Sequence, residues 1–574
     1  MSSIPAVIPR LDDRPAQPPT RSRAVKPGLI ARTTDGVVST FFPKWGLKRT
    51  LFRAKLSQVQ EVLGTFDGYA GGRPSRFTGY STGDGRNENA IPRENIRGCR
   101  ANSYELFRNN PAARKVVRQI VTKVVGLGRW PQSLASRDGK AFPEFRARAE
   151  QIFRRVSRDL DYRGRPGQGG LHFVGIQALA LQSTVLGGDI FYQPVRFDGK
   201  EQRRRGLFLP LSVQLIAGER VAGDTTTVRP EGDNIVFDGV EINPNTGRRE
   251  AYWIQSGHPR DPIFADVAQT LKRYDASAIR HLYVSEDVDQ VRGVPWFAPA
   301  ILQFRDTGDY QYNELKTSAL AACMMIGVQR GVGGAEVGIS LNDPRSGAAD
   351  ATDGDGNRVS VMQPGMILDL GEGGDIKTAF PQRSQQAEPF ILHMFRTIAA
   401  AFPGVKASAI TGDYRNASFS SERAADNETW PEVEFVQDWF ATDFCQPIYE
   451  AVISVAVEQG LFADVISDEE FLSRRDELLP ANWQGPVARS INPVDDRNAS
   501  RLAIAGMLSS LQDECDKQGS DWVKNLEDLK AVLDQAKQIG LPEDFVLAAL
   551  ANQKTLPTDN EQGAGDGRAQ EAGQ

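Results

Sequence analysis

Residues 294–325 read VPWFAPAILQFRDTGDYQYNELKTSALAACMM, and residues 384–405 read SQQAEPFILHMFRTIAAAFPGV. In both stretches apolar residues recur at the spacing of one helix face. The apolar positions of the first stretch are Ile301, Phe304, Gly308, Tyr312, Leu315 and Ala319. Between the two stretches, residues 330–380 are rich in Gly and Asp. The sequence therefore predicts two long helices, near 295–324 and 384–402, joined by a segment that ends in short strands.

A polar loop and a third helical pattern follow. The loop reads SAITGDYRNASFSSE at residues 408–422, and the helical pattern continues from Ser420 to Glu458. A proline inside a helix removes a hydrogen bond and clashes with the preceding turn. We therefore expect this helix to be broken and kinked at Pro431 and Pro447.

The first 290 residues predict an α+β region in which helices precede an antiparallel sheet. Asn110 and Pro111 have the cap and first-turn pattern of a helix that ends at Gly126. Two more helices are predicted at 143–162 and 173–187. Alternating strand patterns follow in GDIFYQPVRF, LSVQLIAGERV, NIVFDGVEINPNTGRREAYWI and IRHLYVSED.

The sequence also predicts a turn between two strands and a helical C-terminal region. The sequence Asn-Pro-Asn-Thr-Gly at 243–247 predicts a hairpin turn between two of the strands. Residues 468–540 predict a series of short helices.

Composition restricts the class of protein. The 574 residues exceed what one hydrophobic core usually supports, so several subdomains are expected. With 68 basic and 73 acidic residues the formal net charge is −5, which excludes a simple basic nucleic-acid-binding chain. The four Cys and four His are scattered without a CxxC pair, which argues against a zinc site and favours a reducing cytoplasm. We find no signal peptide and no uninterrupted run of 18 apolar residues, so no membrane span is predicted.

The motifs of common enzyme classes are absent from the sequence. There is no G-x-x-x-x-G-K-[ST] phosphate loop, no G-x-S-x-G and no H-E-x-x-H. Residues 353–357 imitate the start of an EF-hand loop, but Arg358 and Pro364 occupy the positions that the motif gives to Gly and Glu. The sequence therefore predicts no catalytic residue, no cofactor and no metal site, and the function is expected to lie in the shape of the protein.

The order of elements resembles the lambda-type portal proteins of tailed phages. The segments that carry the resemblance are NPAARKVVRQIVTKVVGLG (110–128), GDIFYQPVR (188–196), VQLIAGERV (213–221), GVEINPNTGRREAYWI (239–254), GVPWF (293–297), ITGDYRNASFSSERAA (410–425) and NPVDDRNASRLAIAGMLSSLQDECDKQGSDW (492–522). The likeness covers roughly residues 30–555. Its more specific parts are the ITGDY…SFSSxRAA junction and the LIxxERV strand.

The resemblance implies an α+β portal fold with long central helices and small β-sheets, divided into wing, stem, clip and crown. The implied division is a disordered basic arm at 1–29, the wing at 30–294, the first stem helix at 295–324, the clip at 325–383, the second stem helix at 384–404, a tunnel loop at 405–421, the kinked long helix of the wing at 422–458, the crown at 459–556 and a disordered tail at 557–574.

The resemblance also implies a function. A portal protein forms a ring, usually of twelve subunits, at one vertex of the capsid; it would be assembled in the host cytoplasm and retained in the virion. Double-stranded DNA would enter and leave through the axial channel. The clip would dock the large subunit of the terminase during packaging and a head-completion or adaptor protein afterwards. The wing would contact the major capsid and scaffold proteins.

Two groups of residues are candidates for facing the DNA. They are Lys406, Tyr414, Arg415 and Asn416 in the tunnel loop, and Arg305, Lys316 and Arg396 in the stem helices. The loop is either a mobile finger that touches DNA or an ordinary surface loop. The stem cations either face the channel or form ion pairs with Asp306, Asp309 and Glu388. Because every neutralised phosphate adds salt-dependent affinity, a conduit for DNA needs few inward cations, and a net charge of −5 suits weak sliding contact.

Two other functions stay open at this point. One is a different head–tail connector or adaptor ring, although such proteins are generally much shorter. The other is a DNA-processing enzyme of a mobile element, which would need a cluster of carboxylates that binds a metal ion.

Overall fold

The computed structural model of the chain describes residue 89 and residues 93–224, 227–259, 270–322, 326–330, 350–352, 358–360, 367–372, 387–415, 418–488, 493–520 and 522–542. The predicted basic arm at 1–29, the polar tail at 557–574, the EF-hand-like residues 353–357 and Asn416 lie outside the described residues.

A layer of helices precedes the sheets. These helices are α3 (Arg93–Asn109), α4 (Pro111–Val124), α5 (Pro143–Val156) and α6 (Phe173–Gly187). Asn110 caps α4, because its Oδ1 atom accepts hydrogen bonds from the N–H groups of Ala112 (2.9 Å) and Ala113 (3.2 Å). Pro111 occupies the first turn, where a helix needs no N–H donor. The helices predicted to start at residues 111, 143 and 173 are confirmed, and α5 ends earlier than predicted.

Small antiparallel sheets follow. One sheet has the order β10 (Arg280–Leu282), β4 (Ile190–Arg196) and β5 (Leu211–Ala217). The other has the order β6 (Ile235–Phe237), β7 (Val240–Ile242), β8 (Arg249–Gln255) and β9 (Leu271–Asp275). The predicted hairpin turn joins β7 to β8, and the N–H group of Gly247 donates a 2.9 Å hydrogen bond to the carbonyl oxygen of Asn243. The predicted α+β class with small sheets is confirmed.

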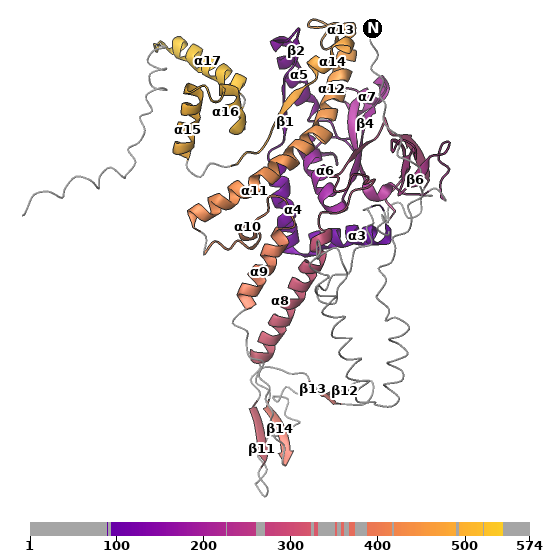
Figure 1. The fold of residues 1–574 in the computed structure, drawn as a ribbon, viewed down its shortest axis with the longest axis vertical. Coiled ribbons are helices and arrows are strands. Elements are labelled where there is room, and N and C mark those ends of the chain that lie inside the picture. Colours follow the sequence, from indigo (N-terminus) through magenta and orange to yellow (C-terminus); the bar gives the residue numbers. More distant parts are fainter. Residues whose placement is uncertain are drawn as a thin grey trace, which may run out of the picture. The chain divides into compact units, whose positions relative to one another are not determined.

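Two long helices occupy the positions that the opening stretches predicted. They are α8 (Ile301–Ala322), preceded by a 3₁₀ turn at Ala298–Ala300, and α9 (Ala387–Ala399). The two helices lie side by side (Figure 1). With a rise of about 1.5 Å per residue, α8 is about 33 Å long.

The third helical pattern divides at a different place from the predicted one. Helix α11 (Phe419–Phe440) continues through Pro431, so the expected break at this residue is wrong. Pro431 is exposed, and water can therefore hydrate the carbonyl group that the proline leaves without a donor. A π-helical turn at Ala441–Cys445 follows, and α12 (Gln446–Glu458) has Pro447 in its first turn. The predicted interruption near Pro447 is confirmed, as a π-helical turn.

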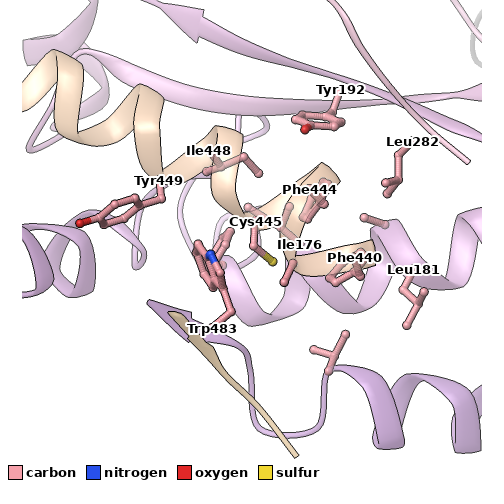
Figure 2. Close-up of a cluster of buried hydrophobic side chains, with 14 of the residues drawn as sticks. Ile176, Leu181, Tyr192, Leu282, Phe440, Phe444, Cys445, Ile448, Tyr449 and Trp483 are labelled. Atoms are coloured by element: carbon pink, nitrogen blue, oxygen red, sulfur yellow. The ribbon is translucent and has the colours of Figure 1, made fainter. Parts of the chain in front are cut away.

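The core lies where α11, the π-helical turn and α12 cross the N-terminal helices and the β10–β4–β5 sheet. Figure 2 shows Phe440, Phe444 and Cys445 of the helical segment in one buried cluster with Tyr192 of β4. The ring centroids of Tyr192 and Phe444 are 4.9 Å apart, and those of Phe440 and Phe444 are 5.0 Å apart. Each fully buried aromatic side chain of this kind contributes roughly 2–3 kcal/mol of transfer free energy. The long helix is thereby fixed to the first half of the chain.

The chain after α12 returns to the same core. Helices α13 (Asp468–Ser473) and α14 (Arg475–Leu478) lead to β15 (Ala481–Gln484), which pairs antiparallel with β1 (Trp130–Ser133). Arg129 donates a 2.8 Å hydrogen bond to the carbonyl oxygen of Trp483, whose side chain packs in the core. Residues up to 484 therefore pack against the same core as the first half of the chain. Helices α15 (Pro493–Ala505), α16 (Leu511–Lys517) and α17 (Trp522–Ile539) follow.

Short strands lie between α8 and α9. Strand β11 (Ile326–Arg330) pairs with β14 (Ile367–Glu372) in parallel, and β12 (Asp350–Thr352) pairs with β13 (Arg358–Ser360) in antiparallel orientation. These strands agree with the prediction that this segment ends in short strands. Among the helices of the described residues, none has both the length and the apolar character to cross a membrane.

Candidate functional site

One face of α8 packs against α9 and the core. The ring centroids of Tyr310 and Phe390 are 4.8 Å apart, which ties the middle of α8 to α9. At the base of the pair, the ring of Phe297 lies 5.7 Å from Phe304 and 4.7 Å from Phe402. The two helices therefore form a pair that is anchored by aromatic contacts at its base.

Another face of α8 carries apolar side chains that nothing in the described chain covers. The predicted stripe is buried at Phe304, but its continuation is exposed at Tyr312 (57%) and Leu315 (69%). At about 100° per residue, Tyr312 lies about 200° around the helix from Tyr310, which contacts α9. We call the exposed side chains of Tyr312, Leu315 and Ala319 the α8 stripe.

The stem cations differ in their surroundings. Arg305 forms an ion pair with the adjacent Asp306 (3.0 Å), and both side chains are exposed. The ammonium group of Lys316 lies 4.3 Å from the centroid of the Tyr312 ring. Arg396 is exposed on α9 and has no ion pair with a described residue. Of the three, Arg396 is the cation best placed to act on a ligand.

Lys406, at the start of the tunnel loop, is engaged within the chain. Its Nζ atom lies 2.7 Å from Glu422 and 2.8 Å from Asp426, both on α11. Its side chain is only 15% exposed. Burial lowers the pKa of Lys406, but the two carboxylates outweigh this effect and raise the pKa above its ordinary value. Lys406 joins the short helix α10 (Ala407–Thr411) to α11.

The base of the tunnel loop is held by a tight turn. The backbone N–H of Gly404 donates a 2.9 Å hydrogen bond to Glu432, and its carbonyl oxygen accepts a 2.7 Å bond from Lys123. Gly404 has a φ of +67°, and a Cβ atom there would lie 2.1 Å from Val433. Only glycine fits this position. The start of the loop is therefore fixed to α4 and α11 through Gly404.

The exposed part of the loop carries Tyr414 and Arg415. Arg415 forms ion pairs with Asp413 and with Glu388 on α9. Hydrogen bonds from Arg415 lower the pKa of Asp413 to about 2. The Tyr414 side chain is exposed. The structure thus brings Arg415 and the stem together, while the charge of Arg415 is balanced by two carboxylates.

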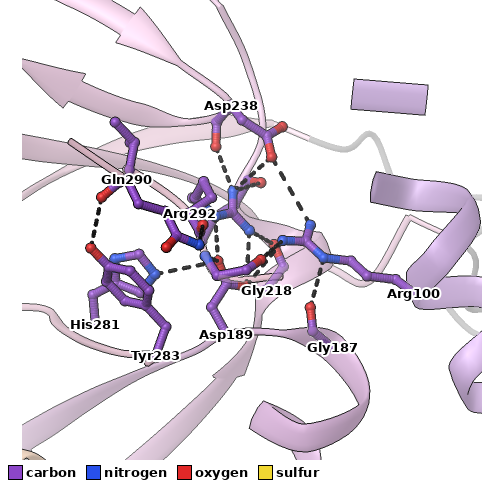
Figure 3. A network of polar contacts seen from close by, with 12 residues as sticks. Arg100, Gly187, Asp189, Gly218, Asp238, His281, Tyr283, Gln290 and Arg292 are labelled. Carbon is purple, nitrogen blue, oxygen red and sulfur yellow. Dashed lines mark hydrogen bonds and ion pairs between the residues drawn. The ribbon is translucent and has the colours of Figure 1, made fainter. Parts of the chain in front are cut away.

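A buried ionic network fixes the segment that leads into α8. The carboxylate of Asp189 lies 2.5 Å from the Nε atom of Arg292 and 3.3 Å from Arg100 (Figure 3). Arg292 also contacts Asp238 (3.2 Å) and donates to the carbonyl oxygen of Gly218 (2.8 Å). Arg292 directly precedes the segment Gly293–Phe297 that opens α8. The network therefore holds the base of the stem pair against α3, β4 and the turn after β5.

Close backbone contact reinforces this network. A Cβ atom at Gly293 would lie 2.2 Å from the carbonyl oxygen of Gly188, and one at Gly188 would lie 2.5 Å from that of Gly293. Both positions need glycine because the two chain segments touch. The N–H group of Gly293 donates a 3.2 Å hydrogen bond to Asp189.

The network changes the pKa values of its own buried groups. Burial alone would raise the pKa of the Asp189 carboxyl group, but Arg292, Arg100 and His281 hold it well below its usual range. Burial lowers the pKa of His281 to about 4, although Asp189 acts in the opposite direction. The imidazole is stacked on Phe191, with ring centroids 4.0 Å apart. Sequence reasoning missed this network because its members come from distant segments, and none forms a motif with its neighbours.

The chemistry available here is structural. Within the residues that the structure describes, no group of three or more His, Cys, Asp or Glu side chains is placed to hold a metal ion. In the buried network the carboxylates of Asp189 and Asp238 are engaged by Arg292 and Arg100.

Known proteins share this sequence pattern. A family model described as "Phage portal protein, lambda family" matches residues 74–437. The probable portal protein of Halomonas phage phiHAP-1 is 22% identical over 466 residues, which cover 79% of this chain and 84% of that protein.

Solved structures from gene transfer agent (GTA) particles also align. A chain from the neck of the native GTA particle, computed with C12 symmetry, is 14% identical, with a TM-score of 0.32 and coverage of 66% of this chain and 94% of that one. A chain from the virion of the native particle is 15% identical, with a TM-score of 0.33 and coverage of 70% and 97%. Because the match to the family model spans more than half of the residues, the chain belongs to the lambda family of phage portal proteins.

Proposed function

We propose that this portal protein assembles into a ring of twelve subunits at a unique vertex of the capsid. Double-stranded DNA is packaged and ejected through the axial channel of the ring. The observation that carries the proposal is the family match over 74–437, which includes both stem helices and the tunnel loop. As a member of this family, the chain is a structural, non-enzymatic component of the virion.

The α8 stripe supports a ring with stem helices in contact between subunits. Exposed Tyr312 and Leu315 lie on a face of α8 that α9 leaves open. In a closed cyclic ring each subunit presents two different complementary faces. Because Tyr312 and Leu315 are 57% and 69% exposed, burying the rest of both against a neighbour contributes roughly 2–4 kcal/mol per contact before the entropic cost of association. The stripe is therefore the proposed contact between neighbouring stems.

The proposed division of the chain follows from this arrangement. The stem is the α8–α9 pair, and the clip is the segment between them, which docks the large terminase subunit and later the head-completion or adaptor protein. The wing extends from the N-terminal helices through β15 and contacts the major capsid and scaffold proteins. We assign the crown to α15–α17, because β15 still pairs with β1 of the wing.

The structural support for a contact with DNA differs among the proposed DNA-facing residues. Tyr414 and Arg415 are exposed in the tunnel loop, Asn416 is proposed from the sequence alone, and Arg396 is the stem cation without an ion pair to a described residue. Arg305 and Lys316 have partners next to them in sequence or on the same helix. Lys406 has a positioning role, because its ammonium group is held by Glu422 and Asp426.

The test is the native mass of the purified chain and of a stripe variant. The wild type is expected as a ring with a central hole and a mass near twelve times 63.0 kDa, measured by light scattering and negative-stain imaging. The double variant Tyr312→Asp/Leu315→Asp should stay folded and fail to form rings.

Val288→Asp is the matched control, since Val288 is 96% exposed and lies outside α8. It should form rings like the wild type. A wild-type chain that stays monomeric both alone and with its capsid and scaffold proteins would contradict the ring. Rings formed by the double variant would contradict the assignment of the α8 stripe.

A further inference from the structure

A strongly basic surface lies far in sequence from the stem and the tunnel loop. It combines the end of α5 and the following loop (154–165) with α7 (Gly199–Arg205) and its flanking residues. Residues 154–165 and 198–206 contain nine basic and four acidic residues, which gives a formal charge of +5. The whole chain has a formal charge of −5. We call this surface the arginine patch.

Contacts between the two segments make the patch one surface. Arg205 donates a 2.8 Å hydrogen bond to the carbonyl oxygen of Tyr162, and its guanidinium group lies 5.0 Å from the centre of the Tyr162 ring. The ring of Tyr162 stacks on Phe197, with centroids 6.0 Å apart. Arg155, near the end of α5, lies 3.9 Å from the centre of the Phe208 ring, just beyond α7. These stacked rings hold the two basic segments in a fixed relation.

The eight arginines of the patch differ in their partners: Arg155 lies over the Phe208 ring, and Arg165 forms a 3.5 Å ion pair with Asp159. Some are bound within the chain: Arg163 to Asp161 (2.8 Å), Arg204 to Glu201 (2.7 Å) and Arg205 to Glu201 (2.7 Å). Others are exposed and have no ion pair with a described residue. They are Arg154, Arg158 and Arg203. The patch therefore presents cationic groups that no carboxylate of the described chain neutralises.

The surface is hollowed between the loop and α7. A cavity of about 520 Å³ is lined by Arg163, Arg165, Arg204 and Arg205 together with Tyr162, Gln168 and Asp161, the carboxylate partner of Arg163. The Nε atom of Arg165 is buried and has no hydrogen-bond partner in the described chain. A guanidinium group offers several donors in a planar arrangement that matches the oxygens of a phosphate. The hollow thus concentrates such donors on one concave surface.

We propose that the arginine patch binds the phosphate backbone of double-stranded DNA, as a second DNA contact separate from the tunnel loop. The patch shares no residue with α8, α9 or the tunnel loop. The choice of DNA as the partner rests on the proposed function, because a portal ring lies next to packaged duplex. Eight of the nine basic residues are arginine, which is the residue type suited to phosphate. Binding through phosphates alone is independent of base sequence and depends strongly on salt.

The experiment measures duplex binding by the full chain over a range of NaCl concentrations. The variant Arg154→Gln/Arg158→Gln/Arg203→Gln removes three exposed charges and no described ion pair. If each arginine neutralises one phosphate, the slope of log affinity against log salt becomes shallower by about 2.7. The ratio of wild-type to variant affinity then falls roughly 40-fold between about 50 and about 200 mM NaCl.

The matched control is Lys115→Gln/Arg118→Gln/Arg229→Gln, which removes the same charge from exposed positions elsewhere. It should keep the wild-type salt slope, and both variants should keep the wild-type melting temperature. Equal slopes for the patch variant and the control would overturn the inference. So would a patch variant that binds duplex normally but loses binding to poly-L-glutamate, since that result identifies an acidic protein surface as the partner.

Ring assembly is measured on the same samples by light scattering. Patch-dependent DNA binding in a chain that forms no rings, either alone or with its capsid and scaffold proteins, would uphold this inference and contradict the proposed ring. If the patch variant forms rings that bind DNA with the wild-type salt slope, this inference is contradicted and the proposed ring is not.

Discussion

The hydroxyl group of Tyr192 donates a 2.5 Å hydrogen bond to the carbonyl oxygen of Asp443. In a continuous α-helix this carbonyl would bond to the N–H group of residue 447, but Pro447 has none. The chain responds with the π-helical turn, in which the N–H group of Gln446 bonds to the carbonyl oxygen of Ala441. A side chain from β4 therefore satisfies the acceptor that a proline in the long helix leaves open.

Replacing Tyr192 by Phe should lower the free energy of unfolding by about 1–2 kcal/mol, because the Asp443 carbonyl group loses its donor. The measurement is the midpoint of urea unfolding. Tyr310→Phe is the control, since it keeps the ring contact with Phe390 and its hydroxyl has no hydrogen bond to a described residue. Equal midpoints for the two variants would show that water replaces the Tyr192 hydroxyl at no cost.

The buried network predicts a loss of stability in weak acid. His281 has a pKa lowered to about 4 in the folded chain, chiefly by burial, against about 6.5 when unfolded. Below pH 6.5 the unfolded chain binds a proton that the folded chain does not, so stability falls as the pH decreases towards 4. Asp189, Arg292 and Arg249 are the charged groups that act on the imidazole. From about pH 7 to about pH 5 this group alone removes about 2 kcal/mol.

His281→Gln should flatten this part of the pH dependence. Glutamine does not titrate, so the variant should lose about 2 kcal/mol less than the wild type between about pH 7 and about pH 5. Urea unfolding at several pH values measures the difference. His393→Gln, at an exposed position on α9, is the matched control. A wild type and a His281 variant with parallel pH profiles would mean that folding does not change the pKa of the imidazole.

Local signals were sufficient for most of the fold. Three examples are the cap at Asn110, the apolar spacing of α4 and the hairpin turn at 243–247. The residues that make up each of these signals are close together in the sequence. The break at Pro431 was predicted from the lost hydrogen bond and the clash with the preceding turn, but α11 continues through this exposed residue. Strand β15 was missed because its pairing with β1 joins residues about 350 positions apart, as at Pro131 and Trp483.

The candidate site was less accessible to sequence reasoning. The sequence located a polar loop between two helices, and the family resemblance suggested its role, but neither could tell that the charge of Lys406 is held by Glu422 and Asp426. The Asp189–Arg292 pair spans 103 residues and leaves no local pattern. Its only sequence trace is glycine at 188 and 293, where two backbone segments touch. Ion pairs between distant segments depend on the tertiary fold, and one sequence gives no information on them.

Lys406→Gln should destabilise the junction of α10 and α11. The change leaves Glu422 and Asp426 close together without a cation, and for a partly exposed cluster we expect a loss of about 1–2 kcal/mol. Hydrogen exchange of residues 405–412 measures the local effect. Lys316→Gln, which removes an exposed cation from α8, should leave that exchange unchanged. DNA retention lost in Lys406→Gln without faster exchange would assign Lys406 to the DNA instead.

Deleting residues 411–418 tests whether the tunnel loop faces the channel. Because the base of the loop is fixed at Gly404 and Lys406, the deletion should leave ring assembly intact. Packaging, or retention of packaged DNA, should be impaired. Ring formation is measured by light scattering and packaging by protection of DNA from nuclease in filled capsids. Loss of rings in the deletion variant would place the loop in a subunit interface.

The balanced charge of Arg415 predicts which substitutions slow DNA. In the folded chain Asp413 and Glu388 neutralise its guanidinium group, so contact with a passing phosphate is weak. Asp413→Asn/Glu388→Gln should release this charge in every subunit of the ring and slow packaging several-fold at low salt. High salt should restore the rate, since phosphate contacts weaken with salt. Adding Arg415→Gln to the double variant should restore it as well. A double variant whose slow packaging persists without Arg415 would show that the two carboxylates act by another route.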